Sequence, residues 1–153
     1  MKKILLLGAG RSSTALIEYL LETAAKLDYE ITVADTLLVS AERKTKKNPR
    51  SRPILLDITD EVKTPAEIER ADLVISLLPA YMHPAIALKC VEHRKHLVTA
   101  SYVSDEMKKL EEAAKKAGII LMNESGVDPG LDHASAMKII HHISKIGGKL
   151  VAF

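Results

Sequence analysis

Short apolar runs alternate with longer amphipathic segments along the 153-residue chain. The runs are rich in leucine, isoleucine and valine, which is typical of strands buried on both faces of a parallel sheet. Gly8 and Pro79 close two of these runs, at points where a strand has to stop. The predicted strands are Ile4–Leu7, Ile31–Ala34, Ile54–Leu56, Asp72–Leu78, Leu97–Thr99 and Ile119–Met122.

Between these runs, apolar residues recur every three or four positions, as they do on one face of a helix. Thr64, Pro65 and Glu67 form the signature of a helix start, with Thr64 as the N-cap. Ser104 begins another helix, and Gly118 ends it. Strands and helices that alternate in this order predict an α/β fold, a doubly wound parallel sheet of the Rossmann type. The predicted helices are 13–27, 37–47, 83–94, 104–118 and 131–146, together with a short helix that begins at 64.

Composition and charge narrow the class of protein. Hydrophobic residues make up 47% and charged residues 27% of the chain, as in ordinary globular domains. A net charge of +2 gives no electrostatic reason to expect nucleic acid or a membrane surface as a partner. Cys90 is the only cysteine, which excludes an internal disulfide and predicts a cytoplasmic protein.

The first predicted strand runs directly into a glycine-rich loop that opens the first predicted helix. Gly8 permits a tight turn, and Gly10 lets the backbone approach a pyrophosphate without a Cβ in the way. Free N–H groups at the start of the helix attract an anion. A structural turn in another kind of parallel sheet is the alternative. The loop that we expect to bind a dinucleotide consists of Gly8, Ala9, Gly10, Arg11, Ser12 and Ser13, with Ser13 in place of the usual third glycine.

Asp35 ends the second predicted strand, near the spacing of the acid that binds an adenosine ribose. A carboxylate at this position repels the 2′-phosphate of NADP and therefore favours NAD. The competing signal is a basic run from Arg43 to Arg52, which we interpret as a solvated face. The predicted cofactor is NAD, with NADP as the alternative.

Four phrases in the second half of the chain are chemically distinctive. They are Leu-Val-Ile-Ser-Leu-Leu-Pro at 73–79, His83-Pro84, Val-Thr-Ala-Ser-Tyr-Val at 98–103, and Met-Asn-Glu-Ser-Gly-Val-Asp-Pro-Gly-Leu-Asp-His at 122–133. Together they resemble the glutamate-forming saccharopine dehydrogenase family, over essentially the whole chain but only the N-terminal portion of a family member. The resemblance implies an NAD(P)-dependent oxidoreductase of lysine metabolism. Such an enzyme oxidises saccharopine at the carbon bearing the secondary amine, and water then hydrolyses the imine to glutamate and 2-aminoadipate 6-semialdehyde.

The resemblance also implies roles for individual residues, by matching position. The pyrophosphate would lie against Ala9, Gly10, Arg11 and Ser12. The adenosine half of the cofactor would contact Asp35, Thr36, Asp57 and Ile58. The nicotinamide half would border on Leu77, Leu78, Pro79, Val127 and Pro129. The substrate would contact Ser101, Tyr102 and Asp128. The NADP-using fungal branch of the family has no acid at position 35 and places an arginine next, so Asp35 again favours NAD.

Asp128 is the predicted catalytic residue. Together with Ser76 and Ser101 it lies at or near the carboxyl end of a predicted strand, where open α/β sheets bind their ligands. A carboxylate there can accept a hydrogen bond from a cationic amine, or a proton as the imine forms. The alternative is the turn-forming role of an aspartate before proline. No metal site is predicted, because the histidines lack matching cysteine or carboxylate clusters.

Residues 1–130 are predicted to form the NAD(P)-binding domain, and 131–153 the start of a second, substrate-binding domain that ends in the beginning of a strand at 149–153. We therefore expect a truncated enzyme that binds the cofactor but does not oxidise saccharopine alone. An exposed strand edge at 149–153 would favour a homodimer. A non-catalytic dinucleotide sensor with the same loop stays open. So does another Rossmann oxidoreductase, although the Tyr-x-x-x-Lys pair of short-chain reductases is missing, since Glu106 stands four residues after Tyr102.

Overall fold

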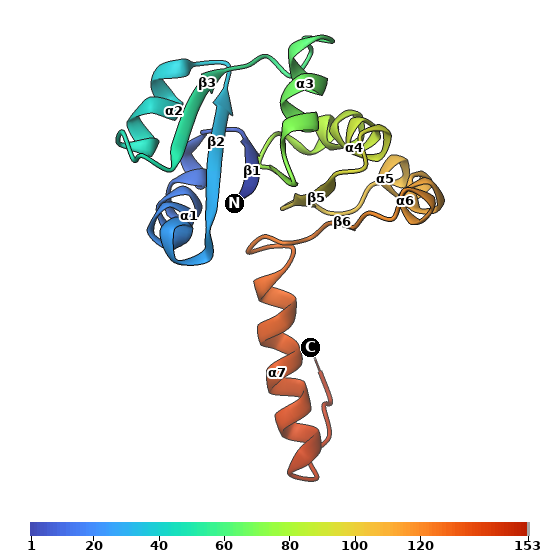
Figure 1. The fold of residues 1–153 in the computed structure, drawn as a ribbon. Helices are drawn as coiled ribbons and strands as arrows, with labels where there is room; N and C mark the ends of the chain where they lie inside the picture. Colours follow the sequence, from blue (N-terminus) through green and yellow to red (C-terminus); the bar gives the residue numbers. More distant parts are fainter. Residues whose placement is uncertain (153) are drawn as a thin grey trace.

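The structure, a computed structural model, describes residues 1–152. Six parallel strands form one sheet in the order β3-β2-β1-β4-β5-β6 (Figure 1). This is the strand order of a doubly wound Rossmann sheet, in which the order reverses between β1 and β4. The predicted fold class is therefore confirmed. The strands are β1 (Lys2–Leu7), β2 (Tyr29–Asp35), β3 (Ser51–Leu55), β4 (Leu73–Ser76), β5 (His96–Thr99) and β6 (Leu121–Met122).

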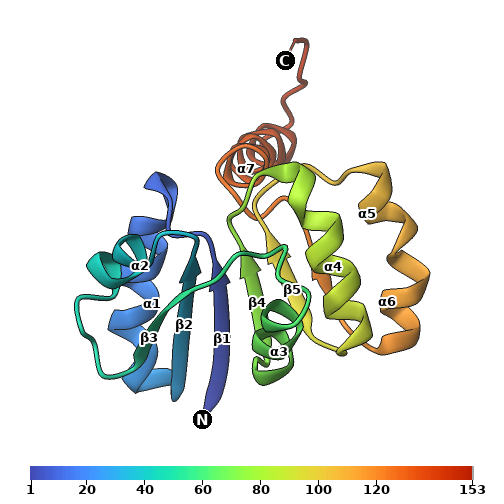
Figure 2. The same ribbon diagram turned by 90° about the horizontal axis from the view of Figure 1, so that it is seen from above.

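Helices lie on both faces of the sheet (Figures 1 and 2). One face packs against α1 (Thr14–Leu27) and α2 (Leu38–Thr45), and the other against α3 (Lys63–Arg70), α4 (His83–Glu92) and α5 (Asp105–Lys109). The last helix of that second group is α6 (Glu111–Ala117). Two short 3₁₀ turns, η1 (Arg11–Ser13) and η2 (Ala80–Met82), precede α1 and α4.

The central strand β1 supplies both halves of the core, because successive side chains of a strand point to opposite faces. Leu6 is fully buried against Ile17 of α1. Leu5 and Leu7 are buried in the other cluster, which Ile86 of α4 joins. A strand with both faces covered has to be apolar throughout, so the continuous run at the start of the sequence follows directly from the fold.

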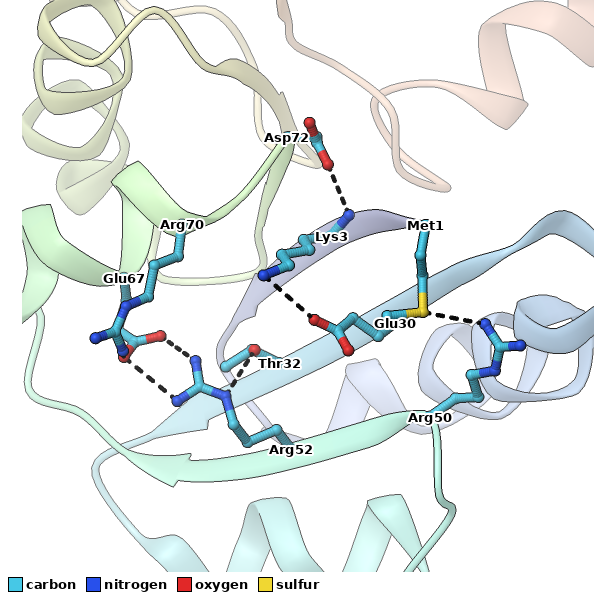
Figure 3. A network of polar contacts seen from close by, with 9 residues as sticks. All are labelled: Met1, Lys3, Glu30, Thr32, Arg50, Arg52, Glu67, Arg70 and Asp72. Atoms are coloured by element: carbon cyan, nitrogen blue, oxygen red, sulfur yellow. Dashed lines mark hydrogen bonds and ion pairs between the residues drawn. The ribbon is translucent and has the colours of Figure 1, made fainter.

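A polar network links α3 to β2 and β3 (Figure 3). Glu67 of α3 forms ion pairs with Arg70 in its own helix and with Arg52 of β3. The Nε atom of Arg52 also donates to the hydroxyl of Thr32 on β2, at 3.3 Å. Lys3 adds an ion pair to Glu30. Lys3, Glu30 and Arg52 lie near the amino ends of their strands, whereas the glycine-rich loop follows the carboxyl end of β1.

Two helix starts differ from the sequence prediction. Thr64 does not cap α3. Its buried hydroxyl donates to the carbonyl of Asp57 at 3.2 Å, and the carboxylate of Asp60 accepts from the Val62 and Lys63 N–H groups instead. The single helix predicted over 104–118 is divided at Leu110 (φ −85°, ψ −4°), which packs against the core and whose N–H donates to the Met107 carbonyl, three residues back, at 3.1 Å.

The final helix, α7 (Leu131–Lys145), extends away from the sheet (Figure 1), and none of its residues is buried. Residues 149–152 form no strand, and Phe153 lies outside the described residues. The strand edge expected to favour a homodimer is therefore not formed by residues 149–152. Within residues 1–152, no helix has both the length and the apolar character that a bilayer crossing needs.

Candidate functional site

The glycine-rich loop lies where the carboxyl ends of β1 and β4 meet. Gly8 has a φ of +101°, and a Cβ added there would lie 3.2 Å from the carbonyl oxygen of Leu77. The N–H of Leu77 in turn donates to the carbonyl of Leu7. The predicted pyrophosphate loop and the predicted nicotinamide border, Leu77–Pro79, are thus neighbours at the point where the strand order reverses. Ligands of doubly wound sheets bind in the crevice at this point.

The loop presents free backbone donors to an anion. Within residues 1–152, no acceptor pairs with the N–H groups of Gly10, Arg11 or Ser12, whereas Ser13 N–H donates to the Gly10 carbonyl. A Cβ at Gly10 would meet no atom within 4 Å, so the space above the loop is open. Adjacent free N–H groups at a helix N-terminus form a cradle for phosphate oxygens. The residues present therefore fit a dinucleotide pyrophosphate.

Asp35 holds the loop in this shape. Its Oδ2 accepts from the N–H of Ala9 at 2.7 Å, and its Oδ1 accepts from the N–H of Leu37 at 2.9 Å. Ala9 is buried, and its N–H is used by this bond rather than being free for a ligand. The carboxylate thus stands directly beside the loop, in contact with its backbone.

The remaining residues predicted to hold the adenosine half follow β2 and β3. Thr36 is exposed next to Asp35, and Ile58 is half-buried. Leu56, at the end of β3, donates its N–H to the carbonyl of Asp35 at 2.9 Å, which brings the two loops together. Asp57 accepts bonds from the backbone and hydroxyl of Thr59, which lower the pKa of its carboxyl.

His83 links the ends of β4 and β5. Its Nδ1 lies 3.0 Å from the Oγ of Ser76, and its Nε2 lies 2.9 Å from the Oγ of Ser101. The side chain is buried, and desolvation lowers the pKa of His83. The neutral ring therefore positions Ser101, one of the predicted substrate contacts.

Lowering the pH is expected to destabilise the fold through His83. Because its pKa is lower in the folded state than in the unfolded chain, the unfolded state binds a proton first as pH falls below about 6.5. Stability should then decrease by at most about 1.4 kcal/mol per pH unit, and this loss should stop below the folded pKa. Urea denaturation at pH 7.5, 6.0 and 5.0 measures the effect.

In His83→Gln, which keeps a donor and an acceptor, this part of the pH dependence should disappear. His141→Gln is the matched control, because His141 is exposed on α7 and should leave the pH dependence as in the wild type. An unchanged slope in His83→Gln would contradict the assignment.

Tyr102 and Asp128 form the second half of the site. The Tyr102 hydroxyl donates to Oδ1 of Asp128 at 2.5 Å, and this bond raises the pKa of Tyr102. Both side chains are exposed, so a ligand can reach them. The two residues lie in separate segments of the sequence. The fold brings them together, because the loop after β5 carries Tyr102 and the loop after β6 carries Asp128.

A closed turn carries Asp128. The N–H of Gly126 donates to the carbonyl of Pro129, and the N–H of Leu131 donates back to the carbonyl of Gly126, both at 3.0 Å. The peptide bond between Asp128 and Pro129 is cis. Val127 is exposed on this turn, and Pro129 is buried beneath it. The turn holds the carboxylate of Asp128 on the side of the molecule where α7 begins.

One residue near the cofactor loop escaped the sequence prediction. Lys44 belongs to the basic run interpreted as a solvated face, yet its side chain is only 8% exposed and its ammonium contacts the glycine-rich loop. Lys44 follows the buried Ala41 by three positions and so lies on the same face of α2, and this spacing is the signal that could have identified it. Cys90 is buried as its helical position suggests, and burial raises its pKa to about 12. Among residues 1–152, no cluster of three or more histidine, cysteine or carboxylate side chains could hold a metal.

Comparison with known proteins assigns the family. The model of the saccharopine dehydrogenase NADP binding domain matches residues 4–122. Saccharopine dehydrogenase [NADP(+), L-glutamate-forming] of Schizosaccharomyces pombe is 43% identical over 153 residues, which are 100% of this chain and 33% of that protein. The alpha-aminoadipic semialdehyde synthase of Arabidopsis thaliana is 37% identical over 169 aligned residues, which cover 98% of this chain and 16% of that protein.

A solved structure gives the same result. Apo saccharopine dehydrogenase (L-Glu forming) of Saccharomyces cerevisiae superposes with a TM-score of 0.85 at 37% identity, over 98% of this chain and 33% of that one. The chain thus spans about a third of the length of each of these two saccharopine dehydrogenases. It belongs to the saccharopine dehydrogenase family, and the part of that family it matches is the domain described by the model.

Proposed function

We propose that this chain is the dinucleotide-binding part of an oxidoreductase that converts saccharopine to glutamate and 2-aminoadipate 6-semialdehyde. The observation that carries the proposal is the position of two features on one edge of the sheet. The three free amides of the glycine-rich loop follow β1, and the Tyr102–Asp128 pair follows β5 and β6. Leu77 lies beside the first feature, and we expect a cofactor that is bound there and extends past Leu77 to reach the second.

In the proposed reaction, the protein side chains bind and orient the substrate. The bound nicotinamide supplies the chemistry of accepting a hydride from the carbon that bears the secondary amine. Asp128 accepts a hydrogen bond from the substrate amine, or its proton as the imine forms. Tyr102 fixes the orientation of that carboxylate, and Ser101, held by His83, adds a polar contact to the substrate.

NAD is the cofactor that the local chemistry supports, although the relatives are named for NADP. Asp35 places a negative charge beside the loop, where a 2′-phosphate would be repelled. The two residues that follow, Thr36 and Leu37, carry no positive charge to offset it. The single cysteine, which is buried, is in keeping with a reducing compartment, and we place the chain in the cytoplasm.

Residues 131–153 are assigned in this proposal to the substrate-binding domain, and 1–130 to the cofactor domain. The lack of any buried residue in α7 supports the boundary. Leu131 and Ile139 are 64% and 61% exposed, which leaves apolar surface for the substrate-binding domain to cover. On this basis we expect cofactor binding, but little or no turnover, from the 153-residue chain.

Calorimetric titration tests the proposal. We expect NAD⁺ to bind at least about tenfold more tightly than NADP⁺, because the like charges of Asp35 and a 2′-phosphate would be brought together. Asp35→Ser should narrow this difference, whereas Glu42→Gln, which removes an exposed acid from α2, should leave it unchanged. A wild-type preference for NADP⁺ would contradict the NAD assignment.

A second titration, of saccharopine into the NAD⁺-bound chain, distinguishes two hypotheses: that the chain is part of the dehydrogenase, and that it is a non-catalytic dinucleotide sensor. Binding that weakens in Asp128→Asn supports the proposed substrate. Tight NAD⁺ binding without any saccharopine binding would favour the non-catalytic sensor instead.

A further inference from the structure

Lys44 is a buried charge in contact with the cofactor loop. It lies in the last turn of α2, outside the glycine-rich motif, and its ammonium donates to the Gly10 carbonyl and to the Ser13 hydroxyl, the latter at 2.7 Å. Lysine is rarely buried in proteins unless a partner stabilises its charge. Here the partners are two neutral oxygens of the loop itself.

Two helix ends act on this ammonium in opposite senses: the C-terminal end of its own helix α2, where a positive charge is favourable, and the N-terminal end of η1 and α1, where it is not. No carboxylate within residues 1–152 lies within ion-pair distance of the ammonium. Desolvation lowers the pKa of Lys44, Arg43 lowers it further, and the negative charge of Asp35 offsets part of this effect. The buried ammonium thus lies beside the helix end to which a pyrophosphate would bind, without a carboxylate as its ion-pair partner.

The loop is tied from two sides. Asp35 accepts from the N–H of Ala9, and Lys44 donates to the carbonyl of Gly10 and to the hydroxyl of Ser13. The free N–H groups of Gly10, Arg11 and Ser12 lie between these two anchors. A loop held at both ends keeps its donors aligned before a ligand arrives, which lowers the entropic cost of binding.

We propose that Lys44 is a positioning residue for the cofactor pyrophosphate, which fixes the Gly10–Ser13 donors and adds a buried positive charge beneath them. The inference rests on the proposed function, because it uses the same dinucleotide site. The anion supplies the negative charge that the buried ammonium lacks, and the ammonium strengthens the attraction of the helix N-terminus for that anion.

Lys44→Met tests the inference, because methionine is unbranched and similar in bulk to the aliphatic part of lysine but carries no charge. We expect this variant to bind NAD⁺ and inorganic pyrophosphate at least about tenfold more weakly than the wild type, the size of effect that a partly buried charge at a helix end can have. Binding of adenosine, which has no phosphate, should change less than about twofold, since the adenosine contacts lie elsewhere. Calorimetry measures each ligand.

Lys47→Met is the matched control. It removes the same charge from an exposed side chain three residues further along, so it should bind NAD⁺ as the wild type does. Equal losses in Lys44→Met and Lys47→Met would show that only net charge matters and would overturn the inference. A loss in Lys44→Met that is the same for adenosine and NAD⁺ would reduce Lys44 to a structural role.

Two further results keep the test decisive. If circular dichroism shows that Lys44→Met does not fold, the same titrations are made with Lys44→Gln. Glutamine retains a donor for the Gly10 carbonyl but carries no charge. If the wild type binds neither NAD⁺ nor NADP⁺, both the proposed function and this inference are overturned. If the wild type binds NAD⁺ and Lys44→Met binds it equally well, only the inference fails.

Discussion

Replacing Gly8 with alanine is expected to lower the free energy of unfolding by about 2–4 kcal/mol and to weaken NAD⁺ binding more than about tenfold. At a φ of +101° an L side chain is strained, and the new Cβ would be pressed to within 3.2 Å of the Leu77 carbonyl oxygen and 3.3 Å of its carbon. Both contacts are with backbone, so relief requires β1 and the β4 loop to separate. Urea denaturation and calorimetry measure the two effects.

Gly118→Ala serves as the control, because its φ of +71° also disfavours a side chain but no atom lies within 4 Å of the added Cβ. It should cost only about 1 kcal/mol and leave NAD⁺ affinity unchanged. Gly8→Ala protein with wild-type affinity would show that the close approach of Gly8 to Leu77 does not shape the binding loop.

Replacing Gly130 with alanine is expected to open the turn that carries Asp128. The added Cβ would overlap the carbonyl oxygen of Gly126 and would lie 2.7 Å from that of Glu124, at a φ of +143°. The substitution should strain this surface turn by about 3 kcal/mol or more. Because the turn lies at the surface, we expect it to open locally while the rest of the chain stays folded. Hydrogen exchange at the amides of Leu131 and Asp132, which the turn protects, should accelerate at least about tenfold.

The same variant should lose saccharopine binding, because the turn no longer holds Asp128 against Tyr102. Gly147→Ala is the comparison, since it has a φ of +78° but open space around the added Cβ, and exchange at the Gly126–Leu131 turn should not change. Unaltered exchange in Gly130→Ala would mean that the turn adapts without opening.

The arrangement of the sheet could be predicted from the sequence because its causes are local. A continuous apolar run followed by glycine indicates a buried parallel strand and its exit, and this reasoning located β1 and the loop after it. Asp35 could be placed beside the loop for the same reason, since in the Rossmann fold the end of β2 lies next to the end of β1. The structure adds that the carboxylate bonds to the backbone of Ala9, a contact that spacing alone does not specify.

Features that depend on packing between distant segments could not be predicted. The charge of Lys44 made it look solvated, and only the packing of α2 on α1 brings the ammonium to Gly10. In the sequence, His83 stood out only within one of the segments that resemble the family. Its contacts could not be predicted, because its two serine partners lie on a strand and in a loop far from each other in the chain. At Thr64 the local capping pattern was misleading, since Asp60 offered a charged acceptor earlier in the chain.

The hydrogen bond between Ala9 and Asp35 also couples the cofactor to assembly of the whole sheet. It joins residues that are brought together only when β1 and β2 pair in register, so the unfolded chain has no such loop to offer. A ligand that binds only the assembled form stabilises it by mass action, by about 2.7 kcal/mol when its concentration is 100 times its dissociation constant. On the proposed function, a dinucleotide would therefore stabilise the folded chain as well as take part in the reaction, and its concentration would help to set how much of the chain survives proteolysis.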